Sequence, residues 1–311
     1  MKILFLLLFL SCHAMAGVIT PSILVETTAP VLDFVIRQNT IWAGTANGQL
    51  LQLSLQGKRI SSISLPLLKN HWGEQAPQRV MSVDVSHDGK TIVMAAEDGC
   101  LYVVRDGKAI KTAYATPSVI KKIVLLSESR VMIALLCNEM ILFDLNQNKV
   151  IQTLSAGTSP LSDMAASSDR KHAFVAGEAG IVSMIDTTNL TMVRQIKGGN
   201  VDNIYKIDVQ NGFVMTAGQD RRAIIYTMAG KIAQRFDGSF LIYSVALSPS
   251  ANRAVAALDE LNSLSVFDVK TGQLIATAEG HQATLNRIVF IDEKRFVSCA
   301  DENKILFWEL P

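Results

Sequence analysis

The stretch from Arg295 to Leu310 reads RFVSCADENKILFWEL, and this stretch decides the fold. Two alternating apolar segments flank a polar turn, which is the pattern of a β-hairpin. Weaker copies recur along the chain, each closed by an aromatic or aliphatic residue that a carboxylate often follows. The closing residues are Leu53, Val104, Phe143, Ile185, Tyr226, Phe267 and Trp308, at intervals of 51, 39, 42, 41, 41 and 41 residues. A period in the forties built from short strands is typical of a β-propeller.

Each repeat unit reads as four short strands. In the second unit, alternating segments cover residues 81–86, 91–96, 100–104 and 109–115. The seventh unit ends at Pro311, directly after its third strand, whereas residues 22–28 form a strand that belongs to no unit. We therefore expect residues 22–28 to pair with residues 305–310 and to close the ring, because closure removes an open sheet edge. The sequence predicts an all-β, seven-bladed β-propeller in a single domain over residues 17–311.

The first sixteen residues have a different character. Lys2 precedes an unbroken apolar run over residues 3–10, and the small residues Ala14 and Ala16 precede Gly17. This is the pattern of a secretory signal peptide, with cleavage between Ala16 and Gly17 and export to a bacterial periplasm. Eight apolar residues are too few to span a membrane, so no transmembrane segment is expected. A lipid anchor at Cys12 and an uncleaved N-terminus remain as alternatives.

Charge and cysteine content limit the classes of partner and cofactor. The chain has 29 basic and 28 acidic residues, a net charge of +1, and no basic run. Nucleic-acid binding needs a phosphate-neutralising patch, so no nucleic-acid partner is expected. The chain is expected to be monomeric on its own. Cys100, Cys137 and Cys299 show no metal or redox spacing and are interpreted as small buried hydrophobic residues, with their redox state left open.

Residues of the seventh unit carry a family resemblance. Gly280-His281, Ser298, Asp301 and Trp308-Glu309 resemble the glycine–histidine, strand serine, turn aspartate and tryptophan–acid positions of WD-repeat seven-bladed propellers. The resemblance extends over residues 22–311 and implies that His281, Ser298, Asp301 and Trp308 form a structural hydrogen-bonded set within one blade. Asp301 lies one residue further from the tryptophan than the family pattern has it.

A narrower resemblance concerns the whole chain. In its single divergent propeller, its length and its N-terminal segment, it resembles the exported WD-repeat accessory proteins of bacterial periplasmic nitrate reductase systems. This resemblance implies an exported, non-catalytic interaction scaffold. Its partner would be another periplasmic protein or protein complex, such as that reductase or a similar respiratory enzyme, and it would hold no cofactor itself.

Catalytic motifs are absent from the sequence: it has no nucleophile elbow, no H-E-x-x-H and no phosphate-binding glycine loop. No catalytic, cofactor-binding or metal-binding residues are therefore assigned. A rival hypothesis is a propeller hydrolase or lactonase with a site at the channel mouth, for which Asp84 and Asp208 are the nearest inner-strand acids. A third hypothesis is a scaffold for assembly at the outer membrane.

Two features are candidate binding surfaces. The long first interval contains an insertion, residues 66–78, with His71 and Trp72, and insertions often mark the binding face of a repeat protein. The alternative is that Trp72 folds back over a blade edge.

The second feature comes from aligning the predicted inner strands. One matched position reads Asp33, Ser82, Lys122, Asp163, Lys206, Ser244 and Arg287. We expect these residues near the mouth of the central channel, on the same face as the insertion. Mixed charges there suit mutual ion pairs or a polar partner segment, and the alternative is a wet channel mouth with solvated charges.

Overall fold

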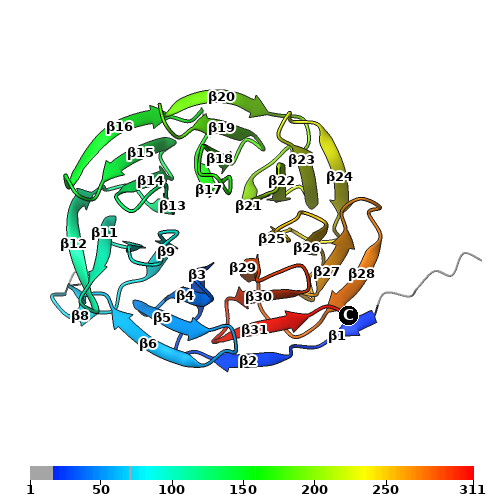
Figure 1. The fold of residues 1–311 in the computed structure, drawn as a ribbon, viewed down its shortest axis with the longest axis horizontal. Helices are drawn as coiled ribbons and strands as arrows, with labels where there is room; N and C mark the ends of the chain where they lie inside the picture. Colours follow the sequence, from blue (N-terminus) through cyan, green and yellow to red (C-terminus); the bar gives the residue numbers. More distant parts are fainter. Residues whose placement is uncertain (1–16, 70–71, 158) are drawn as a thin grey trace, which may run out of the picture.

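The computed structural model is a ring of seven β-sheets arranged around a central channel (Figure 1). It describes residues 17–69, 72–157 and 159–311. Within these ranges the regular secondary structure consists of strands, and no helix is long and apolar enough to cross a membrane. The prediction of an all-β, seven-bladed propeller is confirmed.

Each blade is a sheet of strands in sequence order from the channel outward. Blade 1 contains β3 (Val31–Arg37), β4 (Thr40–Thr45), β5 (Gln49–Ser54) and β6 (Arg59–Ser64). Blade 2 contains β9 (Val80–Val85), β10 (Ile92–Ala96), β11 (Cys100–Arg105) and β12 (Lys108–Ala115). Blade 3 contains β13 (Ile120–Leu125), β14 (Arg130–Leu135), β15 (Glu139–Asp144) and β16 (Lys149–Ser155). Blade 4 contains β17 (Leu161–Ala166), β18 (His172–Gly177), β19 (Val182–Asp186) and β20 (Thr191–Ile196).

The remaining blades follow the same order. Blade 5 contains β21 (Ile204–Gln210), β22 (Phe213–Gly218), β23 (Arg222–Thr227) and β24 (Ile232–Asp237). Blade 6 contains β25 (Val245–Leu247), β26 (Arg253–Ala257), β27 (Leu264–Asp268) and β28 (Leu274–Ala278). Blade 7 contains β29 (Leu285–Phe290), β30 (Arg295–Ala300) and β31 (Lys304–Glu309).

The N-terminal segment completes the ring. β2 (Ile23–Glu26) pairs antiparallel with β31, Ile23 opposite Phe307 and Glu26 opposite Lys304, so the predicted closure is confirmed. β1 (Gly17–Ile19) adds to blade 6, parallel to β28, and this pairing was not predicted because three residues carry no readable alternation. Ala16 and the predicted signal peptide lie outside the described residues, so cleavage before Gly17 remains a prediction.

Burial falls from the channel outward. All five residues of β10 are buried, whereas β16 is exposed at six of its seven positions. Second and third strands are covered on both faces by the neighbouring blades, which explains their near-continuous apolar sequences. Each apolar cluster between blades takes residues from two neighbours: one contains Val83 of blade 2 and Trp42 of blade 1. The core is therefore a ring of blade-to-blade contacts.

The disc has two different faces. On one face, outer-to-inner connections bond to second-to-third strand turns, as in Thr116 N–H to Gly99 O (3.0 Å). That face carries the insertion, whose short hairpin joins β7 (Leu68–Lys69) to β8 (Gln75–Ala76), and we call it the insertion face. On the other face, the turns after inner strands meet the turns after third strands, as in Leu145 N–H to Ser129 O (2.7 Å). We call this the cavity face, for the hollow described below.

Candidate functional site

The seven aligned inner-strand residues form one level of the channel, which we call the charge ring: Asp33, Ser82, Lys122, Asp163, Lys206, Ser244 and Arg287. In blades 1, 2, 3, 4, 5 and 7 a β-bulge immediately precedes this position. A bulge re-aims the side chain that follows it, and here it brings charged groups from different blades together.

An ion pair between blades 1 and 3 is the centre of the charge ring. Lys122 Nζ lies 2.7 and 2.5 Å from the two carboxylate oxygens of Asp33. Asp33 also accepts hydrogen bonds from Ser82 Oγ (2.8 Å) and from Val83 N–H (3.0 Å). Burial opposes ionisation of Asp33, but the positive charges of Lys122, Arg287 and Lys206 outweigh it and lower its pKa to about 2. This contact ties blades 1, 2 and 3 together.

The other side of the charge ring is less completely paired. Arg287 Nε lies 3.8 Å from Asp33, and Arg287 Nη1 lies 3.9 Å from Asp163. Asp163 accepts a hydrogen bond from Ile207 N–H at 3.1 Å. Asp163 Oδ1, Ser244 Oγ and Arg287 Nε are buried and have no hydrogen-bond partner among the described residues. The Arg287 guanidinium therefore has donor capacity that the protein does not use.

The charge ring is more buried than an open channel mouth would be. Asp33, Lys122 and Asp163 are at most 5 % exposed. Lys206 and Arg287 are partly buried. The sequence left open whether these charges form ion pairs with one another or are solvated. Asp33 and Lys122 form an ion pair and are not solvated. Contact with a partner at these positions stays a prediction.

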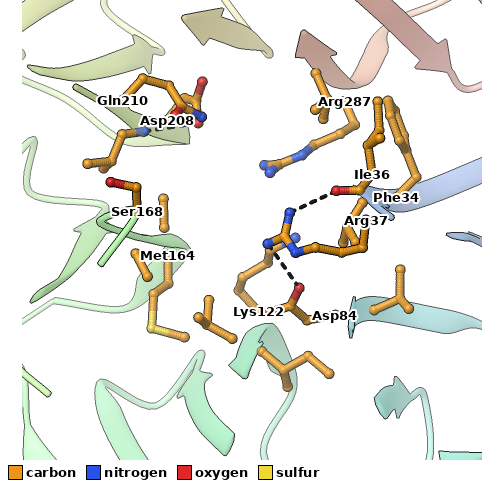
Figure 2. A pocket seen from close by; sticks show the side chains of 18 of the residues that line it. Phe34, Ile36, Arg37, Asp84, Lys122, Met164, Ser168, Asp208, Gln210 and Arg287 are labelled. Atoms are coloured by element: carbon orange, nitrogen blue, oxygen red, sulfur yellow. Dashed lines mark hydrogen bonds and ion pairs between the residues drawn. The ribbon is translucent and has the colours of Figure 1, made fainter. Parts of the chain in front are cut away.

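A cavity of about 580 Å³ occupies the channel between the charge ring and the cavity face (Figure 2). Arg37 enters it from the end of β3, Arg170 from the turn between β17 and β18, and Arg287 from β29. Figure 2 shows Arg37 and Arg287 extending toward the middle of the hollow. Asp84 and Asp208 contribute carboxylates to its wall.

Both wall carboxylates are engaged with main-chain amides. Asp84 accepts from its neighbour Val85 (2.9 Å) and from Leu125 of the next blade (2.7 Å). Asp208 does the same with Val209 (2.9 Å) and Leu247 (2.8 Å). Burial raises the pKa of Asp208, against the opposing charge of Arg287 and these amides. Asp84 and Asp208, the two acids of the hydrolase hypothesis, thus accept hydrogen bonds from the backbone. The described ranges contain no cluster of His, Cys, Asp or Glu side chains suited to a metal ion.

Sequence reasoning missed Arg37 and Arg170. Arg37 is the last residue of β3, at the far end from the charge ring. Extending the inner-strand alignment by four positions beyond Asp33 would have placed it. Arg170 sits in a turn at φ 58°, a left-handed conformation unusual for a residue with a side chain. Nothing in the sequence indicates that this turn directs its arginine into the channel.

The insertion exposes its tryptophan. Trp72 is 82 % exposed in the β7–β8 hairpin, which excludes the alternative in which it covers a blade edge. His71 lies outside the described residues. Further exposed large apolar residues occupy the same face: Leu67, Val119, Val201, Phe240 and Leu261. The other exposed large apolar side chains of the described ranges lie on the outermost strands, and the turns of the cavity face have none.

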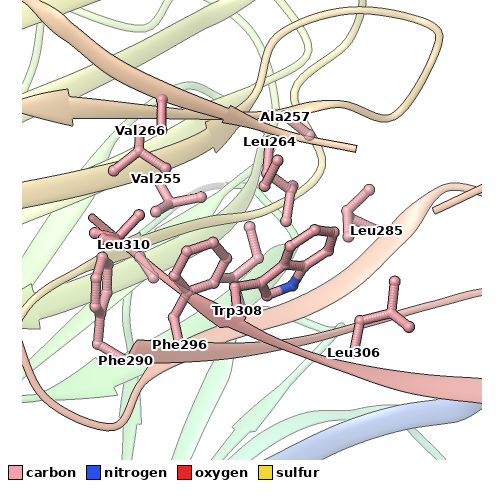
Figure 3. Close-up of a cluster of buried hydrophobic side chains, with 14 of the residues drawn as sticks. Val255, Ala257, Leu264, Val266, Leu285, Phe290, Phe296, Leu306, Trp308 and Leu310 are labelled. Carbon is pink, nitrogen blue, oxygen red and sulfur yellow. The ribbon is translucent and has the colours of Figure 1, made fainter. Parts of the chain in front are cut away.

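The hydrogen-bonded set of blade 7 is present with one change of residue. Ser298 Oγ contacts both His281 Nε2 (2.6 Å) and the Trp308 indole N–H (2.7 Å). The carboxylate at His281 Nδ1 belongs to Glu302 (2.5 Å), not to Asp301 as the resemblance implied. Glu302 is one residue nearer to Trp308, which restores the family spacing. Figure 3 shows the Trp308 indole among apolar side chains of blades 6 and 7.

Blade 5 contains an equivalent set built from other residue types. Thr216 Oγ1 donates to Asn200 Oδ1 (2.6 Å), and Asn200 Nδ2 donates to Asp220 Oδ1 (3.0 Å). Tyr226 takes the place of the tryptophan, with its hydroxyl 3.2 Å from Asn200 N. A sequence pattern written for histidine, serine and tryptophan does not find this set, although its geometry is similar.

Three of the four cysteines lie in the described ranges, and they differ in environment. Cys100 and Cys299 are buried, as expected, but Cys137 is exposed in the second-to-third strand turn of blade 3. The expectation of three buried cysteines is therefore wrong for Cys137, because a turn on the insertion face offers no neighbouring blade to cover it. All three thiols are free of disulfide bonds.

Comparison with known proteins supports the repeat type. Residues 64–104 match the family model "WD domain, G-beta repeat", which covers the insertion and the first three strands of blade 2. The chain is 28 % identical over 100 residues to Pre-mRNA-processing factor 17 of Homo sapiens and of Mus musculus. The aligned region covers 30 % of this chain and 17 % of the length of these relatives.

Proposed function

We propose that this chain, a seven-bladed propeller of the WD40-repeat type, is a non-catalytic scaffold that binds a partner protein through its insertion face. One observation carries the proposal. Among the described residues, the large exposed apolar side chains lie either on the outer strands or on the insertion face. Apolar groups rimmed by polar residues mark protein-interaction sites, and tryptophan is enriched among the residues that dominate binding energy.

Rigidity supports the same proposal. The exposed residues Val201, Phe240 and Leu261 sit on connections and turns between blade strands that the blade-to-blade core holds in place. A surface that is already ordered loses little conformational entropy on binding. Tyr205 and Tyr243 stack at 4.8 Å between neighbouring blades and extend the apolar area toward the channel.

The proposed partner class rests on the N-terminal sequence pattern and on a family resemblance. We propose that residues 1–16 direct export, that the scaffold works in the periplasm, and that its partner is a periplasmic nitrate reductase or a similar respiratory enzyme complex. Support comes from the signal-peptide pattern and from the resemblance to the accessory proteins of such systems. The 100-residue similarity to Pre-mRNA-processing factor 17 concerns less than a third of the chain and does not itself support this partner class.

Co-purification from the native periplasm tests the scaffold. A tagged chain, cross-linked and purified, should recover a defined partner, and the double variant Trp72→Ala, Leu261→Ser should lose it. Ile232→Ser is the matched control, because Ile232 is 51 % exposed but lies on the outer strand β24. Equal recovery with all three proteins would overturn the assignment of the insertion face.

Export and partner identity have separate tests. Intact-mass analysis of the mature chain should show Gly17 at its N-terminus in the periplasmic fraction. Loss of the chain should reduce periplasmic nitrate reduction, and the recovered partner should be a component of that reductase. A cytoplasmic chain that keeps residues 1–16, or an undiminished nitrate reduction, would contradict this part of the proposal.

A further inference from the structure

The cavity on the cavity face is distinct from the surface proposed for protein binding. Its volume of about 580 Å³ lies within the range typical of small-molecule sites, about 300–1,000 Å³. It lies at the end of the channel that the turns after the inner strands surround, away from the insertion. The turns of that face expose no large apolar side chain among the described residues, so the face lacks what a docked protein would cover.

Three arginines approach the cavity without a close carboxylate partner. Arg37 and Arg170 lie 3.5 and 3.6 Å from different oxygens of Asp84, and Arg287 lies 3.8 and 3.9 Å from its two acids. Charge-assisted N–H···O bonds are about 2.7–2.9 Å long, so none of these contacts is a formed hydrogen bond. The Asp84 oxygens are already occupied by main-chain amides at 2.9 and 2.7 Å. Arg37 uses one donor, because its Nη1 donates to Ile36 O at 2.9 Å. The other donors of the three guanidinium groups stay available for an incoming acceptor.

The remaining wall limits what that acceptor can be. Phe34, Val124 and Met164 form apolar parts of the lining (Figure 2 labels Phe34 and Met164). Asp84 and Asp208 would repel a dianion such as phosphate more strongly than they repel a single carboxylate. A planar carboxylate matches the fork of an arginine, and a short hydrocarbon matches the apolar wall.

We propose that this cavity binds a small organic acid, whose carboxylate is held by Arg37, Arg170 and Arg287. Arg287 connects this site to the charge ring, because the same guanidinium faces Asp33 and Asp163. The proposal does not depend on the scaffold function, since it concerns the other face of the disc.

Calorimetric titration of the purified full chain tests the site. The probes are the monocarboxylates acetate, butyrate and benzoate, with inorganic phosphate and a hexaglutamate peptide as comparison ligands. At least one of the three acids should bind with a Kd below about 1 mM. Arg170→Gln should weaken that binding by about tenfold or more, because a charged fork is lost. Arg37→Gln is the second variant and should act in the same direction.

A matched control separates the site from general charge. Arg221 also occupies a turn in a left-handed conformation (φ 63°), but it is exposed on the insertion face, so Arg221→Gln should leave binding unchanged. Absence of binding by all three acids, or equal affinity of the Arg170→Gln chain, would overturn the proposal. Stronger binding of phosphate would overturn the carboxylate assignment. Binding of hexaglutamate alone would overturn the small-acid assignment and give the cavity to an acidic peptide.

Discussion

Two levels of the same channel use charged residues in opposite ways. In the charge ring, Lys122 and Asp33 are in direct contact and almost fully buried. In the cavity next to it, guanidinium and carboxylate groups stay 3.5 Å or more apart, and the carboxylates bond to the backbone. Both levels arise from consecutive parts of the inner strands. Both levels contain charged groups, so the presence of charge does not distinguish them. The charge ring holds blades together because its groups are in direct contact, whereas the cavity keeps unused donors because its groups are not.

The largest expected effect comes from breaking the direct pair. Lys122→Met should lower the free energy of unfolding by about 3–5 kcal/mol, because it leaves the Asp33 carboxylate buried without its counter-ion. The double variant Asp33→Asn, Lys122→Met should recover at least half of that loss, since neither charge remains and the introduced amide oxygen can still accept from Val83 N–H. Urea denaturation measures both. If the double variant loses as much stability as Lys122→Met and the single variant Asp33→Asn lose together, the pair is not a coupled unit.

Acid should act on the same pair. The pKa of Asp33 is lowered to about 2 in the folded chain and lies near 3.8 when the carboxyl is unperturbed. As the pH falls, Asp33 therefore binds a proton in the unfolded chain before it does so in the folded chain. The stabilisation that ionised Asp33 gives the fold is present above about pH 4 and is lost as the pH falls toward 2. The loss amounts to about 2 kcal/mol.

Stability measured from pH 6 to pH 2 tests this expectation. The wild type and the double variant Asp33→Asn, Lys122→Met should converge between pH 4 and pH 2. Parallel profiles would mean that the ionisation of Asp33 does not contribute as the geometry indicates.

Arg287 belongs to both levels and should have an intermediate effect. Arg287→Met keeps most of the apolar stem but removes a charge that faces Asp33 at 3.8 Å and Asp163 at 3.9 Å. We expect a loss of about 1–2 kcal/mol, less than for a direct buried pair. The acid transition of the variant should also begin at higher pH, because Arg287 helps to lower the pKa of Asp33. A loss as large as that of Lys122→Met would erase the distinction between the two levels.

The same comparison shows which parts of the structure the sequence predicts. Alternation and period predict the blades and the pairing of residues 22–28 with the last strand, because these depend on side chains that repeat every second residue. The membership of Asp33 and Lys122 in one channel level was also predictable from aligned inner strands. Their burial was not, since it depends on β-bulges that re-aim side chains and leave no sequence mark. Arg170 could not be placed for a similar reason: its turn is defined by a backbone angle and not by a pattern.

The smallest expected effect on stability concerns the arginines with unused donors. Arg170→Gln should change the free energy of unfolding by less than about 1 kcal/mol, because its side chain is 25 % exposed and its contact to Asp84 is 3.6 Å long. Asp84 would keep its two main-chain hydrogen bonds, so no buried carboxylate loses its partners. Thermal unfolding beside the Arg221→Gln control should show nearly equal midpoints. A destabilisation near that of Lys122→Met would mean that Arg170 is a structural counter-ion after all, and the donors of the cavity would then belong to the fold and not to a ligand.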